Sequence, residues 1–100
     1  MSLKSKLNKF FGKVYEEDQG EYKLFILYER GEPRYVLCVE MEDNLLVGKI
    51  TLFSKAASTD CSSLEYQPEG LYVISTDLDD FVEKLKNKAA RLASLEHVGV

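Results

Sequence analysis

The side chains that most enzymes use for catalysis are sparse in this sequence. Its single histidine, His97, lies close to the C-terminus, and no Ser-His-Asp set, GxSxG elbow, HExxH motif or phosphate-binding glycine loop is present. General acid–base catalysis draws on a histidine or on a carboxyl group whose pKa the fold has shifted. We therefore predict a protein that is not an enzyme and has no catalytic residues.

Two cysteines, Cys38 and Cys61, are candidates for metal or redox chemistry. They form no CxxC pair and have no histidine nearby, so we predict no metal site. The N-terminus lacks an apolar signal segment, and no apolar run approaches the roughly 18 residues that span a bilayer, so we expect a cytosolic protein. In a reducing cytosol two separate free thiols are expected, and a disulfide between them is the less usual alternative.

Carboxylates occur in three groups, within residues 16–21, 40–43 and 77–80. None has the ligand spacing of a calcium-binding loop. Turns and helix starts account for the second and third groups, because acidic side chains are favoured at both. We accordingly predict no metal ion and no cofactor.

Lys23, Phe25 and Lys49 are the best candidates for a site that binds single-stranded nucleic acid, since such sites stack bases on aromatic rings beside basic groups. The net charge of −4 and the pI of about 5.0 argue against a protein whose affinity comes from neutralising phosphates. Nucleic acid is therefore an alternative partner and not the favoured one.

The elements that must position these residues are those of an α+β fold. The chain has 100 residues, of which 45% are hydrophobic and 30% charged, as expected for one globular domain over residues 1–100. Residues 2–14 have the apolar spacing of an amphipathic helix flanked by lysines. An antiparallel β-meander of four to five strands follows, and a helix beginning near residue 78 ends the chain.

Two hairpins set the predicted pairing of the central strands. A turn centred on Gly31-Glu32 places Leu24 opposite Val39, and a turn at Asp43-Asn44 places Met41 opposite Leu46. Gly48 then falls opposite Val39, where a glycine marks a bulge or a close approach by another element.

The last third of the chain is predicted to begin with a polar loop at 54–63. A short strand, a turn at 67–70 and a better strand at 71–74 follow. Thr76 with Asp79 resembles a capping box that starts the C-terminal helix.

This pairing leaves apolar side chains on the sheet face away from the C-terminal helix, and Phe25, Leu27, Val36 and Val47 are the predicted protein-interaction residues. Burying such groups is worth several kcal/mol at roughly 25 cal/mol per Å², and leaving them in water invites aggregation. The N-terminal helix, a second copy of the chain or another protein would cover them.

The favoured interpretation is a small, acidic, non-enzymatic protein-protein interaction module, a homodimeric adaptor or regulator that also uses its acidic segment 15–21 for contact. The alternatives are a single-stranded nucleic-acid-binding protein and peripheral membrane association through the N-terminal helix. Docking of that helix on the sheet is favoured over the membrane, because most amphipathic helices bury their apolar stripe within the protein.

Overall fold

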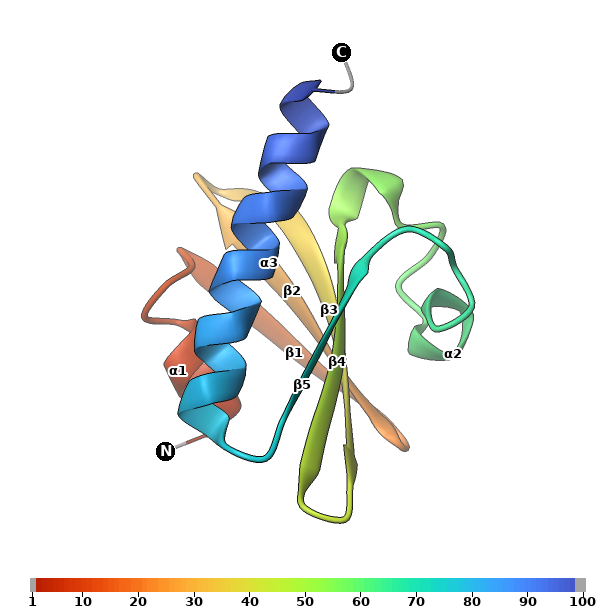
Figure 1. Cartoon of the computed structure of the whole chain (residues 1–100). Coiled ribbons are helices and arrows are strands. Elements are labelled where there is room, and N and C mark those ends of the chain that lie inside the picture. Colours follow the sequence, from red (N-terminus) through yellow and green to blue (C-terminus); the bar gives the residue numbers. More distant parts are fainter. Residues whose placement is uncertain (1, 99–100) are drawn as a thin grey trace.

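The computed structural model describes residues 2–98, with side chains described for residues 2–95. Five strands form one antiparallel sheet in sequence order, with two helices on one face and a short helix on the other (Figure 1). This confirms the predicted α+β arrangement of an N-terminal helix, a meander and a C-terminal helix. The elements are α1 (Leu3–Leu7), β1 (Lys13–Gln19), β2 (Tyr22–Glu29), β3 (Glu32–Glu42), β4 (Leu45–Leu52), the 3-10 turn η1 (Phe53–Lys55), α2 (Cys61–Leu64), β5 (Leu71–Ser75) and α3 (Leu78–Val98).

The N-terminal helix is shorter than predicted, because it ends at Leu7 and does not continue to residue 14. Residues 13–19 instead form β1, which pairs along its whole length with β2. Gly12, just before the strand, disfavours helix by about 1 kcal/mol relative to alanine. The fifth strand is therefore β1, and the short strand predicted before the turn at 67–70 is absent, with α2 lying there instead.

The first hairpin turns one residue earlier than predicted. Its central residues are Arg30 and Gly31, with φ of 55° and 81°, and two positive φ values are the signature of the type I′ turn that suits the twist of paired strands. The earlier turn alone would place Leu24 opposite Leu37, on the same face of β3 as Val39. A register shift between Leu27 and Tyr28 then moves the pairing by one residue, so that Leu24 lies opposite Cys38. A slip of one residue exchanges the two faces of a strand. The predicted orientation of β2 was therefore wrong.

The second hairpin has the predicted register. Asp43 and Asn44 form its turn, with φ of 46° and 68°, and Met41 pairs with Leu46. Gly48 lies opposite Val39 as predicted. A Cβ atom added to Gly48 would lie 2.6 Å from Cζ of Phe81, so the glycine marks a close approach by α3.

The main core lies between the sheet and the two helices α1 and α3. Fully buried side chains from both layers fill it, among them Leu7, Phe25, Leu27, Leu37, Ile50, Phe81 and Leu85. Apolar side chains of α3 lie in this core, whereas Leu95 is 56% exposed. Asp77, and not Thr76, caps the helix, because its Oδ2 accepts a hydrogen bond of 2.9 Å from the Asp80 amide.

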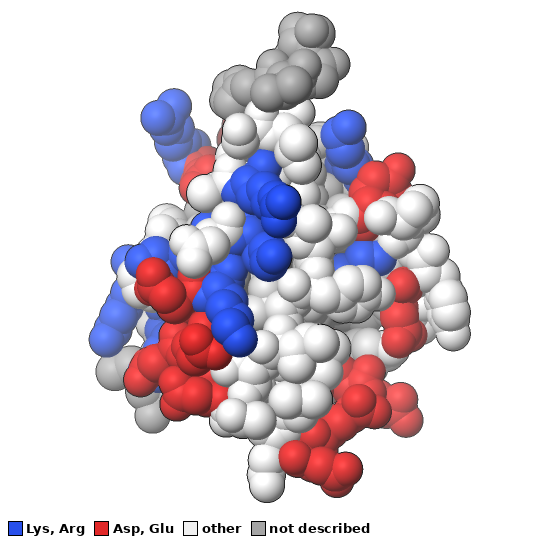
Figure 2. Space-filling view, viewed as in Figure 1, with Lys and Arg blue, Asp and Glu red and all other residues white. Residues whose placement is uncertain are grey.

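Charge is distributed unevenly over the molecule. In the view of Figure 2, basic side chains follow the exposed side of α3, while acidic side chains gather at the start of α3 and around the β3–β4 hairpin. The acidic first turn of α3, with Asp79 and Asp80, complements the positive end of the helix dipole.

Candidate functional site

The sheet face away from α3 is covered in part by the chain's own connection between β4 and β5. We call residues 53–70 the strap. A second, smaller core lies beneath it and consists of Leu24, Val36, Cys38, Cys61 and Leu64. This sheet face is therefore apolar, although Leu24 lies on it and the predicted Phe25 and Leu27 do not, and its central part is covered by a segment that the sequence predicted only as a polar loop and turn.

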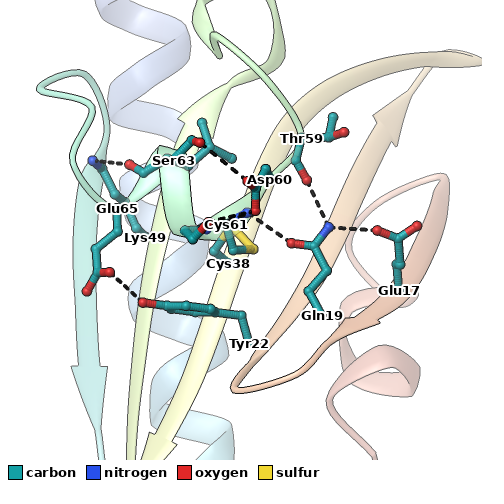
Figure 3. The surroundings of a disulfide bond; sticks show 12 residues. Glu17, Gln19, Tyr22, Cys38, Lys49, Thr59, Asp60, Cys61, Ser63 and Glu65 are labelled. Carbon is teal, nitrogen blue, oxygen red and sulfur yellow. Dashed lines mark hydrogen bonds between the residues drawn. A yellow bond between two sulfur atoms is a disulfide. The ribbon is translucent and has the colours of Figure 1, made fainter.

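A disulfide joins the strap to the sheet. Cys38 in β3 and Cys61 at the start of α2 are bonded, with their Cα atoms 5.7 Å apart (Figure 3). The prediction of two free thiols was wrong, because 23 residues separate the cysteines in sequence and only the return of the strap across the sheet brings them together. The cytosolic location argued alongside it stays a prediction.

Gln19 fastens the strap at the β1 side. Its side-chain oxygen accepts a hydrogen bond of 2.9 Å from the Cys61 amide, and its side-chain nitrogen donates to the carbonyl of Thr59 at 2.9 Å (Figure 3). Tyr22 also reaches the strap, where its hydroxyl donates to the Glu65 carboxylate and this bond raises the pKa of the phenol.

Lys49 fastens the strap from beneath. Only 6% of the residue is exposed, and its ammonium donates to the carbonyl of Leu64 at 2.7 Å and to that of Gln67. The ammonium also lies 5.5 Å from the ring centre of Tyr72. Burial lowers the pKa of Lys49, since the charged form loses hydration.

The four predicted interaction residues do not share a surface. Phe25 and Leu27 lie in the main core under α1 and α3, whereas Val36 lies beneath the strap. Val47 is half-buried on the strap-bearing face, beside the more exposed Ile74 of β5. The expected common face fails because the register shift between Leu27 and Tyr28 changes the pairing of β2 with β3 by one residue, which puts Phe25 and Leu27 on the opposite side.

The three candidates for nucleic-acid binding are separated for the same reason. Lys23 is exposed and pairs with Glu16 at 3.3 Å. Phe25 is 1% exposed within the main core, and Lys49 is buried on the other face. Lys23, Phe25 and Lys49 therefore do not form one binding surface.

The N-terminal segment uses its apolar side chains within the fold. Leu7 and Phe11 belong to the main core, and Leu3 packs against it, although Phe10 is 47% exposed. The stripe considered for membrane attachment is thus largely buried. Within residues 2–98, no helix is long and apolar enough to cross a membrane.

A groove opens on the helix-bearing face, where the hairpins β1–β2 and β3–β4 extend past the starts of α1 and α3 (Figure 1). Its volume is about 780 Å³. Val39 and Leu46 contribute to its floor, with Leu3 and Leu78 at the helix side. Met41 stands at its rim and is 68% exposed, although it points to the same sheet face as the main core.

One wall of the groove is acidic. Glu16 and Asp18 come from β1, and Glu21 comes from the turn that follows. Lys23 is the one basic side chain among the described residues that line the groove, and it pairs with Glu16. The acidic segment 15–21, predicted to serve in contact, therefore supplies this wall. Sequence reasoning did not find the groove, and an apolar Met41 beside a turn was the only signal of it.

Among the residues that the structure describes, no cluster of histidine, cysteine, aspartate or glutamate side chains is placed to hold a metal ion.

Comparison with protein-family models, with curated proteins and with solved structures gave no match.

Proposed function

We propose that this chain is a non-enzymatic protein-binding module and that its groove binds a cationic, amphipathic segment of a partner protein. The observation that carries the proposal is the exposed Met41 beside the acidic wall of Glu16, Asp18 and Glu21. Apolar side chains of the segment would enter the groove, and its basic side chains would face the wall.

The apolar part of the argument rests on the uncovered end of the sheet. The floor of the groove is continuous with the main core, because Phe25, Val39 and Leu46 belong to both. Methionine is common on surfaces that bind varied apolar partners, because its side chain is flexible and polarisable. A partner that covers Met41 would therefore extend the existing core rather than create a separate one.

The negative charge of the acidic wall favours a positively charged partner segment. Three carboxylates face one ammonium along the lining of the groove, and Glu42 and Asp43 follow Met41 in the neighbouring hairpin. Opposite charge speeds encounter and rejects partners of like charge. A basic segment is accordingly favoured over an acidic one with the same apolar pattern.

Peptide titration tests the proposal. One labelled peptide carries leucines at helical spacing with lysines between them, and its counterpart has glutamates in place of the lysines. We expect the basic peptide to bind by fluorescence anisotropy, and we expect Met41→Lys to weaken binding about tenfold or more through lost burial and added repulsion.

A triple variant, Glu16→Gln with Asp18→Asn and Glu21→Gln, should also weaken binding, whereas Glu69→Gln, an exposed acid outside the groove, should not. Equal binding of both peptides, or unchanged binding by Met41→Lys, would contradict the proposal.

Self-association is a second candidate, favoured by apolar side chains that the strap leaves uncovered. Tyr72 is 52% exposed and Ile74 is 49% exposed, and Ile74 pairs with the half-buried Val47. A two-fold dimer would join two such strips. Edge-to-edge pairing of β5 is less favoured, because Lys84 donates a hydrogen bond to the Ile74 carbonyl and places a charge at that edge.

Solution mass tests the dimer. Sedimentation should give twice the chain mass, and Ile74→Glu should shift the equilibrium to monomer, while Leu95→Glu, at an exposed apolar residue of α3, should leave it unchanged. A monomeric mass at the highest concentration reached would remove this candidate without affecting the groove.

A further inference from the structure

We propose that the Cys38–Cys61 bond is a thiol–disulfide exchange site, and that its reduction by a dithiol donor releases the strap from the sheet while the main core stays folded. The inference rests on the strap and its anchors, and it holds whether or not the groove binds a peptide. The ligand class is a dithiol, either a small molecule or a redox-active pair of cysteines on another protein.

The strap and the main core are separate packing units. The main core draws its buried side chains from α1, the five strands and α3, together with Phe11, and takes none from residues 53–70. The strap packs instead on the smaller core around Leu24 and Val36. Loss of the strap therefore removes no side chain from the main core, and local opening without global unfolding is the expected response.

The strap has little apolar packing of its own. Within residues 53–70 only Cys61 and Leu64 are buried, while Phe53 and Ala56 are partly buried against the smaller core and 57–60 are exposed. Ordering a backbone costs about 1–2 kcal/mol per residue, whereas burying one large apolar side chain returns about 1.5–3 kcal/mol. Hydrogen bonds with Gln19 and Lys49 add to the packing, but the covalent link from Cys61 to β3 is what holds the middle of this segment on the sheet.

The dithiol donor supplies the electrons and protons that reduce the disulfide. Cys61 is 1% exposed, so a donor thiolate reaches it when the strap opens locally. Its attack on Cys61 forms a mixed disulfide, and Cys38 leaves as a thiolate that takes up a proton. The second donor thiol then displaces Cys61, which leaves as a thiol, so the donor becomes a disulfide and the chain gains two electrons and two protons. Lys49 lines the same small pocket as both cysteines, and a positive charge near the bond favours a leaving thiolate.

Release of the strap changes the character of this sheet face. Leu24 and Val36, both 1% exposed, would lose their cover and join Ile26, Val47 and Ile74 in one apolar surface. The thiol state of the surroundings would thus control how much apolar surface the protein presents.

Hydrogen exchange on the full chain tests the proposal. The oxidised protein is compared with protein treated with dithiothreitol in native buffer, and the mass gained from the added hydrogens confirms reduction. We expect exchange in residues 53–70 to become about tenfold faster or more, with β2, β3 and α3 unchanged, and an apolar dye to gain fluorescence. Reoxidation should restore both readings.

Two variants separate the covalent link from the polar anchors. Cys38→Ala with Cys61→Ala should show fast strap exchange without dithiol and no response to it. Gln19→Ala, which removes polar anchors and keeps the bond, should leave the strap largely protected until dithiol is added. If the bond resists dithiol in native buffer, if the strap stays protected after reduction, or if all elements lose protection together, the proposal fails.

Discussion

Gly48 is a residue at which the sheet and α3 approach each other closely. An added Cβ would lie 2.6 Å from Cζ of Phe81 and 3.3 Å from Cδ1 of Leu37, and both side chains are fully buried. Neither side chain has free space to move into, because protein interiors are packed as densely as organic crystals. The glycine is therefore needed for space rather than for its backbone freedom.

We expect Gly48→Ala to lower the free energy of unfolding by about 1–3 kcal/mol, the usual cost of overpacking a core. Urea unfolding measures the change. Gly12→Ala is the matched control, because its added Cβ would meet only the Tyr28 carbonyl oxygen at 3.6 Å, an ordinary contact. A Gly48→Ala protein as stable as the parent would show that the Phe81 ring can move aside.

At the scale of elements, the start of α3 depends on one side chain. Asp77→Ala should cost about 1 kcal/mol of stability, because the amide of Asp80 loses its capping acceptor. Thr76→Ala, one residue earlier, should cost much less. Thermal unfolding of both variants compares the two positions, and equal losses would mean that the capping box suggested by the sequence is also used.

The first turn of α3 also predicts a response to acid. Hydrogen bonds from Ser75 and Lys84 hold the pKa of Asp80 below its usual 3.8. Because the folded-state pKa is lowered, the stabilisation is fully present above the unfolded pKa and is lost as pH falls through the folded value.

Asp80→Asn should therefore flatten the fall in stability between about pH 5 and pH 2, measured by urea unfolding at a series of pH values. An unchanged slope would mean that other carboxylates, such as Asp79 beside Lys6, carry the effect.

The two hairpins show how far the sequence could predict this sheet. Asp43-Asn44 was recognised because both residues tolerate positive φ and no competing turn lies beside them. Arg30-Gly31 and Gly31-Glu32 both contain a glycine, and each keeps Glu29 near Arg34, so the charged pair could not distinguish them. The groove and the strap were missed because both depend on where distant segments return, which local patterns do not encode.

The whole molecule has an acidic end and a basic side (Figure 2). Screening shortens from about 10 Å at 0.1 M salt to about 3 Å at 1 M, so attraction at an open groove should weaken over that range. We expect the affinity for the basic peptide to fall as salt rises, with a smaller fall for the triple variant of the acidic wall. A salt-independent affinity would assign binding to the apolar floor alone.

The order of the strands affects how the chain can fold during its synthesis. Strands β1 to β4 all end by Leu52 and each pairs with its neighbour in sequence, so they can zip together as they leave the ribosome. The helix α3 is synthesised afterwards, and until it is made, Leu37 and Ile50 lack the contacts that Phe81 and Leu85 provide in the main core. The nascent chain therefore passes through a stage in which the apolar face of the sheet is not yet covered by α3, and chaperones would matter most at that stage.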